Sequence, residues 1–145
     1  MDLNIKLLSP NVSVPKYATA GAAAMDLTAC IDEPITIAPR QLVSIPTGIA
    51  IALPSADYVA LVFARSGLGV KHGISLSNGV GVIDSDYRGE IKVGLTNLSD
   101  IPYTVQPGDR VAQLAIMPVV QANIIPVAEL DETDRGAGGF GSTGK

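Results

Sequence analysis

The chain has 145 residues, 47% of them hydrophobic, and a formal net charge of −4. This length suits one domain with a buried core, and the acidic balance excludes broad nucleic-acid binding through a basic surface. The longest apolar runs are strand-sized, far below the roughly 18 residues that a membrane helix needs, so we expect neither a membrane segment nor a secretory leader. With one cysteine, Cys30, and one histidine, His72, the chain has no intrachain disulfide and lacks the ligands of a zinc-deaminase or zinc-protease site. We expect a cytoplasmic protein.

Short apolar runs rich in Val, Ile and Leu alternate with Gly, Pro, Asn and Asp along the chain. Such runs predict strands, and the 10 prolines argue against long helices. The pattern predicts an all-β fold, a jelly-roll or β-clip type barrel of short strands with very little helix. In chain order the predicted strands are Leu3–Leu8, Met25–Ala29, Gln41–Ile45, Gly48–Leu53, Tyr58–Phe63, Gly81–Ile83, Glu90–Leu95 and Arg110–Val120.

The C-terminal segment differs in composition from the rest of the chain. It is rich in glycine, and its one large apolar side chain is Phe140. Such a segment cannot build a core and is expected to be mobile when alone. We therefore predict one domain over residues 1–134 and a flexible tail over residues 135–145.

Four of the five arginines lie beside glycine-containing turns, at Arg65, Arg88, Arg110 and Arg135. Arginine offers a planar fork of donors, and glycine lets backbone N–H groups approach a ligand closely. This combination suits a compact polyanion such as a polyphosphate, although exposed turns also attract arginines. The segments of interest are Ala22–Leu27, Arg65–Lys71, Asn78–Gly89 (which reads as a β-hairpin), Gly108–Leu114 and Arg135–Gly144.

In order and spacing, these five segments resemble the motifs of the trimeric dUTPase family. The likeness covers nearly the whole chain, and the segment around Asp84 and the tail RGAGGFGSTG are its most specific parts. One departure is Ala24-Met25, where the family usually has glycine and an aromatic before the aspartate; Asp26 itself is present. The resemblance implies a jelly-roll homotrimer, with active sites at subunit interfaces, that hydrolyses dUTP to dUMP and pyrophosphate with Mg²⁺.

The resemblance also implies roles for two carboxylates. Asp84 would be the base that takes a proton from the attacking water, and its alternative role is that of a turn-stabilising residue. Asp26 would reach Mg²⁺ through water, and its alternative is a plain solvent-facing strand residue.

The nucleotide contacts follow from the same resemblance. Tyr87 would pack on the deoxyribose and exclude a 2′-hydroxyl, or else be an ordinary hairpin aromatic. If Ser66 begins a helical turn, its free N–H groups favour an anion. Uracil and sugar would be held by Asn78, Gly81, Val82, Ile83 and Tyr87, with Lys92 nearby. The phosphates would be held by Arg65, Ser66, Gly67 and Gln113.

The tail would close over a site on another subunit. Phe140 would stack on the uracil, while Arg135, Gly141, Ser142 and Thr143 would hold the terminal phosphates. Two rival functions are a dCTP deaminase of the same fold and a non-catalytic nucleotide-binding trimer.

Overall fold

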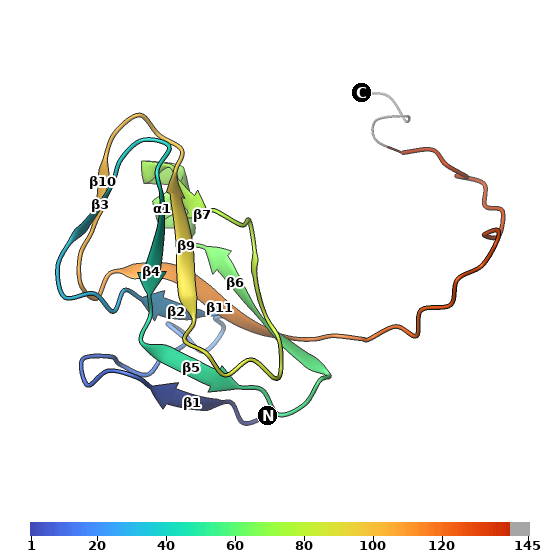
Figure 1. Ribbon diagram of the computed structural model, residues 1–145, viewed down its shortest axis with the longest axis horizontal. Helices are drawn as coiled ribbons and strands as arrows, with labels where there is room; N and C mark the ends of the chain where they lie inside the picture. Colours follow the sequence, from blue (N-terminus) through green and yellow to red (C-terminus); the bar gives the residue numbers. More distant parts are fainter. Residues whose placement is uncertain (140–145) are drawn as a thin grey trace.

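The computed structural model describes residues 1–139, and its regular secondary structure consists almost entirely of short strands (Figure 1). Within these described residues the one helix, α1, spans Ser66–His72. The predicted all-β, jelly-roll-like class with very little helix is confirmed, although the sheets are not closed into a continuous barrel. In chain order the strands are β1 (Asn4–Leu7), β2 (Met25–Thr28), β3 (Ile35–Ile37), β4 (Leu42–Pro46), β5 (Ile49–Ala52), β6 (Tyr58–Ala64), β7 (Ile74–Leu76), β8 (Gly81–Ile83), β9 (Lys92–Asn97), β10 (Tyr103–Val105) and β11 (Arg110–Pro118).

Two larger sheets carry the architecture. One has the strand order β2-β11-β6-β8 and the other β4-β9-β7, while β1 pairs with β5 and β3 with β10. All the pairings are antiparallel. Along β6, Ala60 and Val62 are buried while their neighbours are not, because successive side chains point to opposite faces of a strand. The same alternation on β2 and β9 gives each larger sheet one buried face.

The core lies between these buried faces. Leu27, Ile45, Val93 and Leu114 are almost completely inaccessible and belong to one contiguous cluster. Asn97 is one of two buried polar residues, with Thr47: its amide donates to the carbonyls of Ile37 and Ile101 and accepts from Ser99. A buried amide that is satisfied in this way avoids the penalty of an unpaired polar group.

Three strands were not predicted from the sequence: β3, β7 and β10. Each has three residues, which is too short to display a period of two. Each forms because a partner strand elsewhere in the chain supplies its hydrogen bonds.

The predicted β-hairpin over Asn78–Gly89 is wrong. Strand β8 pairs with β6, whereas the returning strand β9 pairs with β4 and β7 in the other large sheet. The strand predicted from Glu90 to Leu95 begins at Lys92 and ends at Asn97. Turn residues correctly indicated a reversal of the chain, but the pairing partner of each strand was decided by long-range packing. Residues 84–91 are therefore a loop that connects two sheets.

After β11 the chain leaves the body of the protein. Val119 N–H donates to the Asp57 carbonyl at 2.8 Å, and residues 120–139 then run outward as an extended arm, orange to red in Figure 1. Val120, Ile124 and Leu130 on this arm are more than 80% exposed. Among residues 1–139, no helix has the length and apolar character needed to cross a bilayer.

Candidate active site

The first cluster of predicted site residues lies where β2, β6 and β11 meet. Gln113 of β11 is paired with Asp26 of β2 on one side and with Phe63 of β6 on the other. Directly paired residues in antiparallel strands point to the same face, so Asp26 and Gln113 share one face of the sheet. Arg65 follows the end of β6, and Arg110 begins β11. The sheet register thus gathers residues from three segments that are distant in sequence.

The carboxylate of Asp26 is held between two arginines. Arg65 Nε donates to Oδ1 at 3.0 Å and Arg110 Nη1 donates to Oδ2 at 3.2 Å, while Arg65 Nη1 also donates to the Arg110 carbonyl. The Asp26 side chain is only 14% exposed. The alternative of a plain solvent-facing residue at Asp26 is therefore wrong. The ion pairs hold both guanidinium groups at the same end of the sheet, where the N–H donors that Asp26 does not use could bind an anion.

Helix α1 begins beside these arginines, as predicted for Ser66. Arg65 caps the helix in an extended conformation, and its carbonyl accepts from Leu68 and Gly69. The N–H groups of Ser66 and Gly67 precede the first donors of this ladder and have no intrahelical acceptor. The first turn contains no acidic side chain. These N–H groups therefore add to the local positive character next to Arg65.

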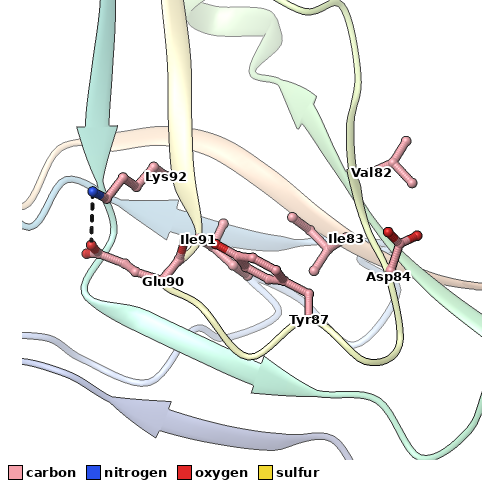
Figure 2. Close-up of a pocket in the computed structure, with 7 residues that line it drawn as sticks. All are labelled: Val82, Ile83, Asp84, Tyr87, Glu90, Ile91 and Lys92. Atoms are coloured by element: carbon pink, nitrogen blue, oxygen red, sulfur yellow. Dashed lines mark hydrogen bonds and ion pairs between the residues drawn. The ribbon is translucent and has the colours of Figure 1, made fainter.

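The second cluster forms a pocket of about 430 Å³ between β8 and the start of β9 (Figure 2). Tyr87 lies in its middle, with Asp84 on one side and the Glu90–Lys92 ion pair on the other. The residues that line the pocket are Val82, Ile83, Asp84, Tyr87, Glu90, Ile91 and Lys92.

Asp84 directly follows β8, and its backbone carbonyl accepts from Tyr87 N–H at 3.2 Å. Among the hydrogen bonds of residues 1–139, none uses the Asp84 carboxylate, so the turn is closed by the main chain and not by this side chain. The carboxylate lies at the pocket, where it is free to accept a proton from a bound water.

Strand β8 is at the edge of its sheet. An edge strand leaves one row of backbone N–H and C=O groups without a strand partner. Within the described part of the chain, this open row lies beside Asp84 and Tyr87, where a base edge could be hydrogen-bonded. Asn78 lies in the turn just before β8, whose Gly81 packs closely on Val62.

Glu90 was missed as a pocket residue by the sequence analysis. Its carboxylate accepts from Gly48 N–H at 2.9 Å and lies 3.9 Å from Lys92 Nζ. The next residue, Ile91, is buried and exchanges main-chain hydrogen bonds with Thr47 and Ile49. The acid directly after Arg88-Gly89 was the only signal in the sequence. These bonds fix the end of the loop that forms the pocket.

The two clusters do not meet within one chain. Gly81 pairs with Val62 and Ile83 with Ala60, so Asp84 continues toward the start of β6, whereas Ser66 follows its end. Six residue-to-residue steps separate the levels of Val59 and Arg65, which corresponds to roughly 20 Å at about 3.3 Å per residue.

Of the tail residues predicted for the site, the structure describes only Arg135. Arg135 lies on the arm, where its Nε donates to the Gly138 carbonyl. Phe140, Gly141, Ser142 and Thr143 lie outside the described residues.

Comparison with known proteins places this geometry in a family. A model of the dUTPase family matches residues 10–144. The chain belongs to the dUTPase family. It is 54% identical to the deoxyuridine 5′-triphosphate nucleotidohydrolase of Idiomarina loihiensis, over 95% of this chain and 91% of the relative. It is also 51% identical to the enzyme of the same name from Paraburkholderia phymatum, over 100% and 99% of the two chains.

The fold agrees with solved dUTPase structures. The dUTPase of Staphylococcus bacteriophage 80alpha, solved with dUpNHpp, superposes with a TM-score of 0.85 at 26% identity and covers 99% of each chain. The two clusters described above therefore occur on a dUTPase fold.

Proposed function

We propose that this protein is a dUTP diphosphatase that hydrolyses dUTP to dUMP and pyrophosphate. The observation that carries the proposal is the pocket at β8, where an unpaired backbone edge, Tyr87 and the Asp84 carboxylate lie together. Membership of the dUTPase family, at more than half identity to curated dUTP nucleotidohydrolases, supports the same reaction. In the cell this activity would keep uracil out of DNA and supply dUMP for thymidylate synthesis.

The base would be read by the main chain of β8 and by Asn78. Cytosine inverts a donor and an acceptor on the edge that uracil presents, and a site built on buried hydrogen bonds rejects such a mismatch strongly. Thymine would be refused by crowding at C5. Tyr87 would pack on the deoxyribose and leave no room for a 2′-hydroxyl, with Lys92 close by.

In the reaction, Asp84 accepts a proton from a water molecule while the oxygen of that water attacks the α-phosphorus of dUTP. The bond from that phosphorus to the bridging oxygen breaks, and pyrophosphate leaves with the electron pair. Arg65, Gln113 and the N–H groups of Ser66 and Gly67 would bind the phosphates. Each charge-assisted hydrogen bond contributes about 1.5–3 kcal/mol, so several are needed to hold a triphosphate on an acidic protein.

Mg²⁺ fits these residues as an ion that is bound mainly by the phosphates of the substrate. Among residues 1–139, no group of three or more His, Cys, Asp or Glu side chains is placed to hold a metal. Asp26 is one carboxylate at the phosphate-binding cluster, and Mg²⁺ commonly binds through substrate phosphates, waters and one or two carboxylates. Asp26 would contact the ion through water. Bound there, the ion would neutralise phosphate charge.

A homotrimer would bring the two clusters together, because one chain holds them at opposite ends of β6. The face of the β2-β11-β6-β8 sheet that points away from the core supports an interface between subunits. Away from the polar end that holds Asp26, Thr28, Arg110 and Gln113, this face is apolar, and its residues by strand register are Val59, Leu61, Phe63, Val82, Ala115 and Met117.

The arm supports exchange between subunits, since its exposed Val, Ile and Leu side chains have no cover within residues 1–139. We propose that residues 135–145 form a lid over a neighbouring subunit's site. Phe140 would stack on uracil, with Arg135, Gly141, Ser142 and Thr143 on the phosphates. Closing such a lid excludes water from the chemistry. We further propose that the enzyme works in the cytoplasm, with no nucleic-acid or membrane partner.

The deciding experiment is pyrophosphate release from dUTP, dCTP, dTTP and UTP in parallel, with Mg²⁺ and with a chelator. We expect rapid release from dUTP with Mg²⁺, and at least about 100-fold lower kcat/KM for the other three. Ammonia release from dCTP would instead indicate a deaminase. Binding of dUTP without pyrophosphate release would indicate a non-catalytic binding protein.

A further inference from the structure

Tyr87 folds back over its own loop, and Gly89 is the residue beneath it. The phenolic hydroxyl donates to the Glu90 carbonyl at 3.0 Å, so the ring spans the loop from residue 87 to residue 90. A Cβ added at Gly89 would overlap Tyr87 Oη and would lie 2.5 Å from Cζ. These separations are far shorter than any van der Waals contact between such atoms. The ring and a side chain at position 89 cannot occupy this space together.

Position 89 requires glycine because the Tyr87 ring leaves no room for a side chain, and not because of the backbone conformation there. Five other glycines have a positive φ, among them Gly48 and Gly79, but Gly89 does not. Alanine can therefore adopt the backbone at position 89 without the strain of a left-handed conformation. Replacing Gly89 with alanine should therefore displace the Tyr87 ring without straining the main chain.

The ring is the part that must yield when a side chain is added. Tyr87 is 44% exposed, so its ring can swing outward into solvent once the hydrogen bond to Glu90 is broken. The backbone beneath is less free: Ile91 is buried and paired with Ile49, and Glu90 is bonded to Gly48. Outward motion of the ring would open the middle of the pocket in Figure 2.

We propose that Gly89 is a positioning residue for sugar selectivity: the missing side chain lets the Tyr87 ring lie flat over the loop, where its bond to Glu90 holds it against the nucleotide sugar. The inference rests on the proposed function, because it assigns to Tyr87 the exclusion of a 2′-hydroxyl. Gly89 itself touches no substrate and acts only through the ring.

The test is a double-mutant cycle on the full-length protein with dUTP and UTP as substrates. The variants are Gly89→Ala, Tyr87→Ala and the double variant, with Gly21→Ala as control, since a Cβ at Gly21 meets nothing within 4 Å. The measured quantity is the ratio of kcat/KM for dUTP to that for UTP. We expect Gly89→Ala to lower this ratio about tenfold, the smaller end of what one group in a pocket contributes, and Gly21→Ala to leave it unchanged.

The cycle separates action through the ring from an independent effect. We expect the double variant to show the ratio of Tyr87→Ala alone, because Gly89 has nothing left to position. A ratio within twofold of wild type in Gly89→Ala, or the same fold loss with and without the Tyr87 ring, overturns the inference.

Tyr87→Phe covers the case in which Gly89→Ala does not fold. It keeps the ring and removes the bond to the Glu90 carbonyl, and we expect a partial loss of the ratio. An unchanged ratio in Tyr87→Phe means that the bond does not hold the ring. Failure of the wild-type protein to hydrolyse dUTP would contradict the proposed function itself. An active enzyme whose variants keep the wild-type selectivity would contradict only the role of Gly89.

Discussion

Replacing Asp26 with alanine removes the one carboxylate that holds both Arg65 and Arg110. The bond to Arg65 is partly buried, with that side chain 23% exposed, and a charge-assisted hydrogen bond in such a place contributes about 1.5–3 kcal/mol. Arg110 is 56% exposed, and its bond adds about 0–1 kcal/mol. The expected loss of stability is about 2–3 kcal/mol, because Arg65 keeps its bond to the Arg110 carbonyl.

For a chain of this size, that loss corresponds to a fall in Tm of roughly 5–10 °C. Thermal unfolding should be followed at one fixed protein concentration, since assembly makes Tm depend on concentration. Asp100→Ala is the matched control: it breaks the Arg40–Asp100 pair, whose N–O distance of 3.3 Å is similar but whose carboxylate is 92% exposed. We expect that control to change Tm by less than about 2 °C.

The same substitution should weaken substrate binding, because two arginines lose the partner that orients them. We expect the KM for dUTP to rise about tenfold, and Asp26→Asn, which retains an acceptor oxygen, to lie between wild type and alanine. If Asp26→Ala and Asp100→Ala unfold at the same temperature, the ion pairs at Asp26 do not stabilise the fold. If KM is also unchanged, they do not organise the phosphate-binding cluster either.

Further predictions concern the base, the tail and alkaline stability. Asp84→Asn should still bind dUTP but lose about 10²–10⁴ in kcat, and activity within tenfold of wild type would remove Asp84 from the role of base. A chain ending after Asp134 should lose most turnover while keeping its oligomeric state in sedimentation; full activity would contradict the lid. The pKa of Tyr103 is raised above its usual value of 10.0, first by burial of the phenol and second by the nearby Asp109 carboxylate. The positive charge of Arg65 lowers this pKa, but by less. Because the folded state holds this proton more tightly than the unfolded state, the stabilisation is complete below about pH 10 and is lost as the pH rises through the raised pKa. Tyr103→Phe should therefore reduce the loss of stability above pH 10, and identical alkaline unfolding curves would refute this.

Residues in the longer strands were predictable because their signal is local. Along β2 and β9, buried and less buried residues alternate. A period of two can be read from a few consecutive residues of the sequence. The turn that starts α1 at Ser66 was also predictable, and its left-handed C-cap is a glycine, Gly73, as helix ends favour. Three of the four three-residue strands, β3, β7 and β10, carry no such local signal and escaped prediction, whereas β8 was predicted.

The contacts within the candidate site depend on long-range pairing. Asp26 meets Arg65 and Arg110 across 39 and 84 residues of sequence, through the register of β2 with β11 and of β11 with β6. Motif spacing indicated that these residues belong together, but not that the carboxylate would sit between two guanidinium groups. Likewise, the sequence led us to expect that Tyr87 faces a sugar, whereas only the tertiary structure shows that its ring lies over Gly89.

By itself, then, the sequence determined the all-β class, most strand positions and the residues that match the dUTPase motifs, because these depend on side-chain type and on short-range periodicity. Only the tertiary structure decided that β8 pairs with β6 and not with β9, and hence that Asp84 and Ser66 lie at opposite ends of one strand. The physical reason is that strand partners are chosen by burying apolar faces contributed from the whole chain. No local pattern contains that information.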